Sequence, residues 1–108
     1  MIPEVGPAEL DRWRHDADAA PPVLVDVREP WEFDYCHISD SQSVPLGALP
    51  VALGTLPRDR DLVVVCHTGM RSYHAAAWLR SAGFQRVFNL RGGVAAWAAE
   101  VDPAMKRY

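Results

Sequence analysis

Val63-Val64-Val65-Cys66-His67-Thr68-Gly69-Met70-Arg71-Ser72 is the segment of the sequence that decides the fold. Its three consecutive valines favour an extended backbone, because β-branched side chains are restricted at χ1 and pack better on a sheet than on a helix. Apolar residues then recur at helical spacing up to Ala82, and Gly83 stands where a helix commonly ends. We therefore predict a buried strand over residues 61–66 and a helix over residues 71–82, joined by a loop that Gly69 allows to turn tightly.

The rest of the chain repeats this alternation of strand-length apolar runs and helical patterns. The run from Val23 to Val27 is continuous, as expected of a strand buried on both faces. Two further strands are predicted over residues 43–45 and 87–90, and helical segments over residues 7–15, 30–33, 46–53 and 94–101. This pattern is typical of a parallel sheet covered by helices, so the predicted fold class is α/β.

Length and composition limit what kind of protein this is. The chain has 108 residues, of which 49% are hydrophobic and 23% charged, and this predicts one globular domain over residues 1–108. A formal charge of −3 without a basic cluster argues against nucleic acid and anionic membranes as partners. The first residues lack the features of a secretory signal, and the two cysteines suit a reducing compartment, so we expect a cytoplasmic location.

Cys66 stands where the predicted buried strand ends and shortly before the predicted helix begins. The free backbone N–H groups of a helix N-terminus carry roughly half a unit of positive charge and favour anions. A free cysteine is only about 3% thiolate at pH 7, and this setting, together with the Arg71 cation, is expected to raise that fraction. The same N–H groups would hold an oxyanion substrate. The segment thus predicts covalent catalysis by Cys66 on an anionic substrate.

Several short motifs, in order along the chain, resemble those of the single-domain rhodaneses. They are Asp26-Val27-Arg28-Glu29, Glu32-Phe33, His37-Ile38, Val44-Pro45, Cys66-x-x-Gly69-x-Arg71-Ser72 and Leu90-x-Gly92-Gly93-x-x-x-Trp97. The resemblance covers residues 23–97 and rests on the whole set, since each motif alone is weak. It implies a three-layer domain with a five-stranded parallel sheet flanked by helices. It also implies a sulfurtransferase in which Cys66 accepts a sulfane sulfur and becomes a persulfide.

The implied reaction has two halves. The Cys66 thiolate attacks the outer sulfur of thiosulfate or a related small anionic donor, and the persulfide then yields its sulfur to cyanide or a thiol acceptor. The substrate would be bound, without a metal or cofactor, by the loop residues His67, Thr68, Gly69, Met70 and Arg71. The loop carries no second cation between Cys66 and Arg71, so a protein persulfide or a low-molecular-weight persulfide stays open as the donor.

Two other functions are weighed against this one. The cell-division-cycle dual-specificity phosphatases share the implied fold, but five residues separate their cysteine and arginine, whereas four separate Cys66 from Arg71. The shorter loop encloses a smaller space, which by resemblance suits a sulfur atom, and the longer loop suits a tetrahedral phosphate. The other alternative is a sulfur-relay or partner-binding module that carries the same persulfide but has little turnover with small molecules.

Several residues within the motifs have a structural interpretation beside a functional one. Asp26 and Arg28 close a buried strand at the sheet edge where ligands gather, and we expect them to form a structural ion pair that supports the site. Arg71 either attracts the substrate anion or organises the loop. His67 either tunes the thiolate or has no chemical role. The Gly92-Gly93 pair is interpreted as a backbone break before the last helix.

The sequence departs from the family pattern in two places. Cys36 stands where the family has a glycine, and Asp40-Ser41 stands where a Gly-Ala pair is usual. The second thiol suggests the hypothesis that Cys36 resolves the persulfide of Cys66 or forms a regulatory disulfide with it. The Cys-His pairs at 36–37 and 66–67 also suggest zinc, but their spacing matches none of the usual ligand patterns, so no metal is expected.

Overall fold

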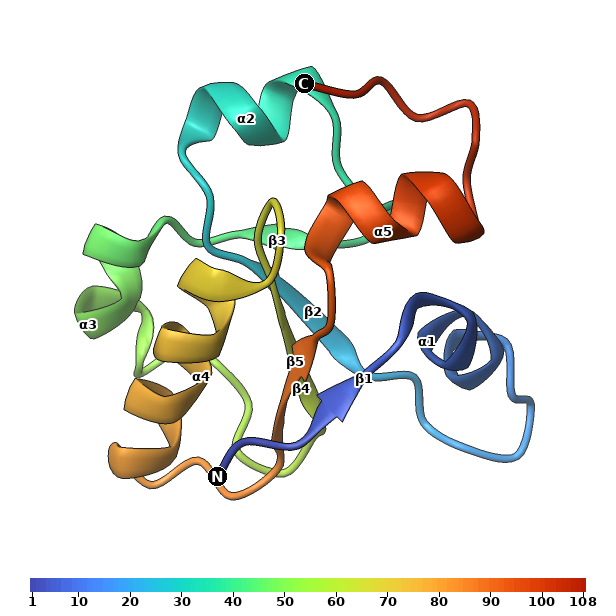
Figure 1. Cartoon of the computed structure of the whole chain (residues 1–108). Coiled ribbons are helices and arrows are strands. Elements are labelled where there is room, and N and C mark those ends of the chain that lie inside the picture. The colour runs from blue at the N-terminus through green and yellow to red at the C-terminus, as the bar shows by residue number, and fades with distance from the viewer.

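A computed structural model describes residues 1–108 and contains one sheet of five parallel strands with helices around it (Figure 1). The strands are β1 (Glu4–Val5), β2 (Val23–Asp26), β3 (Gln42–Ser43), β4 (Leu62–Val65) and β5 (Val87–Leu90). The helices are α1 (Pro7–Arg14), α2 (Pro30–Tyr35), α3 (Leu49–Ala52), α4 (Met70–Ser81) and α5 (Gly93–Glu100), with a 3₁₀ turn, η1 (Leu46–Ala48), before α3. The predicted α/β class and the implied five-stranded parallel sheet are therefore confirmed.

β4 occupies the centre of the sheet, whose strand order is β1-β5-β4-β2-β3. All four of its residues are buried, and it pairs with β2 on one side and β5 on the other. Because both faces of β4 are covered, its sequence is an unbroken apolar run rather than an alternation of apolar and polar residues. Cys66 follows β4 directly and therefore lies at the middle of the carboxyl edge of the sheet.

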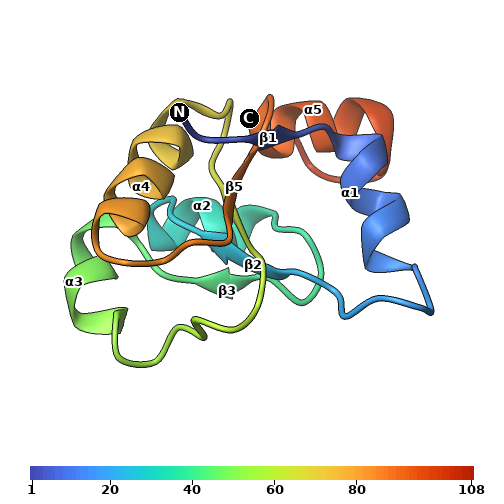
Figure 2. The same cartoon turned by 90° about the horizontal axis from the view of Figure 1, so that it is seen from below.

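Apolar side chains form one core on each face of the sheet. Leu49 of α3 and Leu79 of α4 belong to the same core as Val64. Leu10 of α1 and Trp97 of α5 belong to the core on the opposite face. Figure 2 shows α3 and α4 on one side of the strands and α1 and α5 on the other. Burial of each such side chain stabilises the fold by roughly 1.5–3 kcal/mol, so the two cores give the carboxyl edge a rigid base.

The strand order creates a switch point between β2 and β4. From β2 the chain moves outward to β3, and it then returns to the other side of β2 to form β4. Open α/β sheets bind ligands in the crevice outside the carboxyl ends of their strands at such a point. In Figure 1 three segments gather at this end of the sheet: α2, the loop between β4 and α4, and residues 101–108 after α5.

The observed elements differ from the predicted ones at one strand and at several ends. The sequence does not predict β1, because this strand is only two residues long and is flanked by Pro3 and Gly6. The strand predicted over 43–45 ends at residue 43, and Pro45 in any case has no N–H to extend a ladder. The helix predicted over 46–53 is divided into η1 and α3. α4 and α5 each begin one residue earlier than predicted.

The longest helix, α4, has 12 residues. None of the helices combines the length and the apolar character that crossing a bilayer requires.

Candidate active site

The Cys66 thiol lies at the base of the loop that joins β4 to α4. The cysteine is 1% exposed, and the backbone N–H of Gly69 donates a hydrogen bond to its Sγ over 3.1 Å. Gly69 has a φ of +100°, and a Cβ at this position would lie 3.1 Å from the backbone nitrogen of Gly92. Glycine adopts this conformation without strain. Because residue 69 also lacks a side chain, the loop can turn back and bring the Gly69 N–H group to the sulfur.

A second hydrogen-bonding partner of the sulfur comes from α4. The Ser72 hydroxyl is fully buried and lies 3.2 Å from Cys66 Sγ and 2.5 Å from Oδ1 of Asn89 on β5. The Asn89 amide group donates to Glu4 Oε2 at 2.8 Å and to the carbonyl oxygen of Gly69 at 3.1 Å. Asn89 thus ties the cysteine loop to β5 and β1, and it fixes Ser72 against the sulfur.

The N-terminus of α4 adds donors that the helix itself cannot use. The backbone N–H groups of Met70, Arg71 and Ser72 make no backbone hydrogen bond, as is usual in the first turn of an α-helix. These donors and the partial positive charge of the helix end favour a negative group beside them. The loop therefore suits a thiolate at Cys66 or an anion bound next to it.

Arg71 is held by Glu32 of α2. Its two terminal nitrogens donate to the two carboxylate oxygens of Glu32 at 2.7 and 2.9 Å, in bidentate geometry. The same carboxylate accepts from the Tyr108 hydroxyl at 2.7 Å and from the Glu29 N–H at 2.9 Å. The hydrogen bond from Arg71 lowers the pKa of Glu32 to about 2 despite the opposing effect of burial. Of the two roles left open for Arg71, this geometry favours organising the loop.

The expected ion pair between Asp26 and Arg28 is present and is fully buried. Arg28 donates from Nη2 to Asp26 Oδ2 at 2.7 Å and from Nε to Asp26 Oδ1 at 2.9 Å. It also donates to the Cys36 carbonyl oxygen at 2.6 Å and to the Tyr108 hydroxyl at 2.9 Å. Burial alone would lower the pKa of Arg28, but the hydrogen bonds with Asp26 and Tyr108 raise it overall. The pair therefore connects the end of β2 to the end of α2.

Tyr108 is bonded to both ion pairs. Its hydroxyl donates to Glu32 and accepts from Arg28, and its ring stacks on His67 with the centroids 4.1 Å apart and an interplanar angle of 13°. Partial burial raises the pKa of Tyr108 to about 12, so the phenol is neutral at neutral pH. His67 is therefore packed against an aromatic ring and is not a freely exposed loop residue.

The start of α5 packs directly on the cysteine loop. The N–H of Val94 donates to the carbonyl oxygen of Cys66 at 2.9 Å, and the N–H of Ala95 donates to that of His67 at 3.0 Å. Gly93 has a φ of +60°, and a Cβ at this position would overlap the backbone carbonyls of Cys66 and His67. The interpretation of Gly92-Gly93 as a simple backbone break is therefore incomplete, because Gly93 also forms a close contact with the loop.

The other residues that the sequence singled out make no hydrogen bond to the sulfur, whose partners are Gly69 and Ser72. Thr68 and Met70 are on the exposed side of the loop, and the side chain of Cys36, which follows α2, is partly buried. Cys36 and Cys66 are both free thiols. Asp40 adopts a φ of +66°, the left-handed conformation that a glycine prefers. No group of three or more His, Cys, Asp or Glu side chains is arranged to hold a metal ion.

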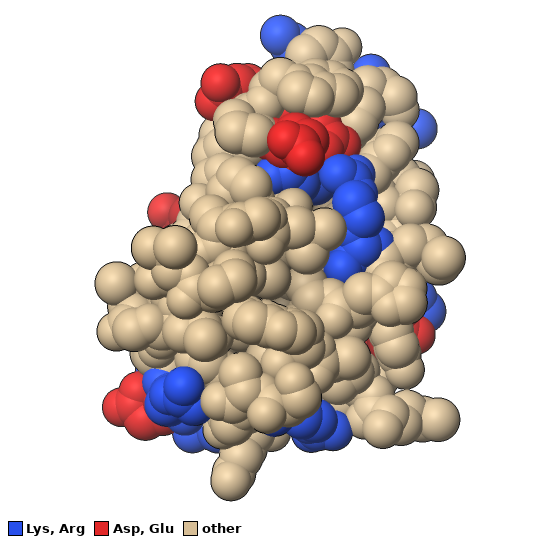
Figure 3. All heavy atoms as spheres, turned by 90° about the vertical axis from the view of Figure 1, so that its left-hand side faces the viewer, with Lys and Arg blue, Asp and Glu red and all other residues tan.

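Two of the arginines at the carboxyl edge of the sheet are paired with carboxylates. Arg28 is paired with Asp26, and Arg71 is paired with Glu32. Figure 3 faces the side of the molecule that carries α3 and α4, and it shows few charged groups across the middle and both signs together near the upper end. An anion that reaches Cys66 would therefore be bound mainly by backbone N–H groups.

Sequence reasoning missed several contributors to this site. Glu32 and Ser72 stand inside the motifs that carried the resemblance, but a motif does not reveal which atoms they contact. Asn89 is a polar residue within a buried apolar strand, and this anomaly was the available signal, as it was for Asp26. Tyr108 lies outside the region of resemblance, and no local pattern indicates its position over the loop.

The five-stranded parallel sheet and the cysteine loop at its switch point together place this chain in one class of α/β domain, and comparison with known families identifies that class. The family model described as Rhodanese-like domain matches residues 6–100, and the chain belongs to this family. The solved rhodanese-like domain of the Alr3790 protein from Anabaena matches with a TM-score of 0.84 at 29% identity, over 100% of this chain and 81% of that one.

Relatives with names indicate the chemistry of the family. A sulfurtransferase of Allochromatium vinosum is 44% identical over 82 residues, which cover 76% of this chain and 77% of that protein. The thiosulfate sulfurtransferase GlpE of Stutzerimonas stutzeri is 39% identical over 75 residues, 69% of each chain. The probable adenylyltransferase/sulfurtransferase MoeZ of Mycobacterium tuberculosis is 38% identical over 106 residues, which are 96% of this chain but 26% of MoeZ. These names support sulfur transfer of the rhodanese type.

Proposed function

We propose that this chain is a sulfurtransferase that carries sulfur as a persulfide of Cys66. The observation that supports this most directly is the position of Cys66 Sγ, 3.1 Å from the Gly69 nitrogen and 3.2 Å from the Ser72 hydroxyl at the start of a 12-residue helix. A thiolate in this position is a nucleophile whose negative charge already has hydrogen-bond donors. The same donors would serve the terminal sulfur of a persulfide.

The proposed reaction is a double displacement. In the first half, the Cys66 thiolate attacks the outer sulfur of thiosulfate, a new S–S bond forms, and the old S–S bond breaks with its electron pair leaving on sulfite. In the second half, cyanide attacks the terminal sulfur, thiocyanate leaves, and the thiolate is restored. A thiol acceptor would react as its thiolate and leave as a persulfide. A persulfide donor could replace thiosulfate in the first half.

The proposed roles of the surrounding residues follow from their contacts. The backbone N–H groups from His67 to Arg71 bind the substrate anion and then the persulfide, with Gly69 already bonded to the sulfur. Arg71 holds the loop in shape through Glu32 and adds positive charge beside it. Asp26 and Arg28 support the loop from the sheet and make no contact with the reacting atoms in this proposal.

The test is the intact mass of the protein before and after incubation with thiosulfate. We expect a gain of one sulfur atom that cyanide removes, and we expect Cys66→Ser, which is nearly isosteric, to prevent the gain while the fold is retained. Cys36→Ser is the matched control and should still gain the sulfur. A gain that persists in Cys66→Ser would disprove the mechanism.

A second candidate function is a sulfur relay that serves a protein partner. One observation favours it: in MoeZ the matching region is only 26% of a longer chain. The comparison that separates the two functions is turnover with thiosulfate and cyanide against turnover with a protein persulfide donor. Turnover with the protein donor alone would favour the relay.

A further inference from the structure

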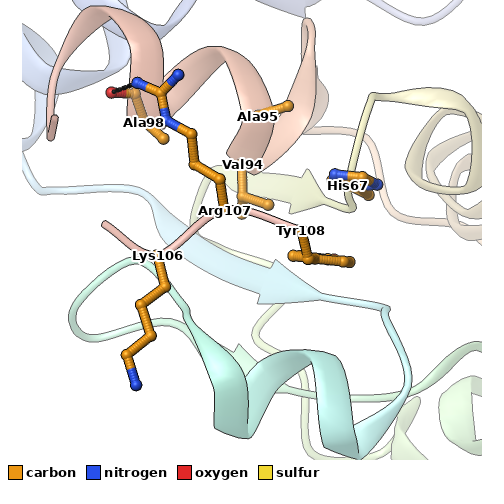
Figure 4. A pocket seen from close by; sticks show the side chains of 7 residues that line it. All are labelled: His67, Val94, Ala95, Ala98, Lys106, Arg107 and Tyr108. Atoms are coloured by element: carbon orange, nitrogen blue, oxygen red, sulfur yellow. Dashed lines mark hydrogen bonds between the residues drawn. The ribbon is translucent and has the colours of Figure 1, made fainter. Parts of the chain in front are cut away.

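Tyr108 covers one side of the loop that holds Cys66. Its ring stacks on His67, the residue next to the cysteine, at a centroid distance of 4.1 Å. Its hydroxyl donates to Glu32, whose carboxylate binds Arg71 at the other end of the loop. Figure 4 shows the ring of Tyr108 facing that of His67. The contacts of this one side chain therefore extend along the loop from the first residue after the cysteine to the arginine.

The position of the ring is fixed by several independent contacts. Trp31 and Tyr35 of α2 meet it edge to face at centroid distances of 5.7 and 5.9 Å. Arg28 is fully buried and Glu32 is 4% exposed, so the Tyr108 hydroxyl satisfies two charged groups that have little access to water. Removing such a partner costs the desolvation of the group left behind, which keeps the ring in place.

A small cavity adjoins the stacked rings. Its volume is about 140 Å³, and it is lined by His67, by residues of α5 and by the segment that carries Tyr108. A cavity of roughly 150 Å³ holds a molecule the size of benzene. Cys66 does not line this cavity, so the cavity marks space for a compact group beside His67, on the side of the loop that the Tyr108 ring covers.

We propose that Tyr108 is a specificity-determining residue whose ring narrows the entrance to Cys66 and selects compact sulfur donors and acceptors over wide ones. The proposal rests on the sulfur transfer proposed above, because it concerns which substrates reach the same sulfur. A wide acceptor reacts only in the fraction of molecules in which the ring has moved off His67. A compact acceptor such as cyanide reacts without that movement.

The test compares two maleimides that share one reactive group and differ in width. The rates of Cys66 alkylation by N-ethylmaleimide and by a pyrenyl maleimide are measured by mass spectrometry of the Cys66 peptide, which separates Cys66 from Cys36. Tyr108→Ala should increase, at least tenfold, the ratio of the alkylation rate with the pyrenyl maleimide to the alkylation rate with N-ethylmaleimide. Tyr108→Phe keeps the ring but loses both hydrogen bonds, and it should increase the ratio about threefold.

Trp78→Ala is the matched control, because Trp78 is an aromatic side chain of similar exposure, 39% against 40% for Tyr108, that does not line this cavity and does not contact Tyr108. Its ratio should stay within twofold of the wild type. Should Tyr108→Ala fail to fold, Tyr108→Phe alone decides. An unchanged ratio in the folded Tyr108 variants, or an equal gain with both reagents, would overturn the proposal, since a general loosening of the fold does not discriminate by width.

A second measurement follows the persulfide itself. Wild-type protein and Tyr108→Ala are loaded with sulfur, and its loss to cyanide is compared with its loss to a wide aromatic thiol. Only the loss to the wide thiol should accelerate in the variant. Failure to load any sulfur would contradict the proposed function, whereas the alkylation ratio would still report the role of Tyr108 at the entrance.

Discussion

The Ser72 hydroxyl has one proton and two acceptors within reach. It lies 3.2 Å from Cys66 Sγ and 2.5 Å from Asn89 Oδ1. When Cys66 is a thiol, its S–H can donate to Ser72 while Ser72 donates to Asn89. When Cys66 is a thiolate, the Ser72 proton is drawn toward the sulfur and the Asn89 oxygen loses part of its partner. The Asn89 oxygen therefore competes with the sulfur for the single Ser72 proton.

Replacing Ser72 by alanine is therefore expected to slow the chemistry of Cys66. A hydrogen bond to a charged group contributes roughly 1.5 kcal/mol, about tenfold in rate, and the competition from Asn89 reduces the expected loss to about three- to tenfold. The measurement is the rate of Cys66 alkylation and of sulfur loading at neutral pH. Ser81→Ala on the same helix, whose hydroxyl bonds only to the Trp78 carbonyl oxygen, is the control and should leave both rates unchanged. Equal rates in Ser72→Ala and wild type would contradict this role.

The Glu32 carboxylate links the stability of the domain to pH. The pKa of Glu32 is lowered from 4.5 to about 2 by the hydrogen bond from Arg71, with burial acting in the opposite direction. A lowered folded-state pKa stabilises the fold above the unfolded-state value, and this contribution is lost as the pH falls from about 4.5 toward about 2. Because Arg71 is partly exposed, solvent screens the ion pair. We therefore expect it to contribute roughly 2 kcal/mol to the free energy of unfolding, which is less than the free energy that the whole pKa shift corresponds to.

The variant Glu32→Gln tests this dependence. The difference in free energy of unfolding between wild type and Glu32→Gln, measured in urea, should be largest above about pH 4.5 and should shrink toward about pH 2. Asp34→Asn removes an exposed charge from the same helix and should give a difference that hardly varies over this range. A Glu32→Gln difference that is constant with pH would show that the ion pair does not carry the effect.

At the scale of elements, the backbone at the start of α5 packs directly against the backbone of the loop that joins β4 to α4. Gly93 has a φ of +60°, and a Cβ there would overlap the carbonyls of Cys66 and His67. Gly93→Ala therefore combines left-handed strain with overpacking, and we expect a loss of about 3 kcal/mol or more in the free energy of unfolding. Gly47→Ala is the control, since no atom lies within 4 Å of the added Cβ, and it should change stability by no more than about 0.5 kcal/mol. Similar stabilities for the two variants would refute the close contact.

The sequence predicts those elements whose signal is local. The valine run of β4 and the helical spacing of α4 were sufficient to place the cysteine between a strand and a helix, because β-branching and apolar periodicity act within a few residues. β1 could not be predicted in this way, because its two residues form a strand only by pairing with β5. The same limit applies to Glu32 and Asn89, whose partners lie far away along the chain.

At the scale of the whole molecule, the electrostatic field offers little attraction for an anionic donor. The chain carries a formal charge of −3, and both Arg28 and Arg71 are neutralised by carboxylate partners. A site that steers its substrate electrostatically loses association rate steeply as salt increases. Here the backbone N–H groups of the loop act over short distances, within which salt has little screening effect.

Sulfur loading of Cys66 by thiosulfate is therefore expected to depend weakly on ionic strength. Between about 0.05 and about 0.5 M salt, the Debye length falls severalfold, and the rate of persulfide formation should change by less than about threefold. The direction of this change should be a slight increase, because salt screens the repulsion between the thiosulfate dianion and a chain of net charge −3. Stopped-flow or quenched mass measurements at constant pH provide the rate. A decrease of tenfold or more would mean that unpaired cations, such as Lys106 and Arg107 in the segment beside the loop, guide the donor after all.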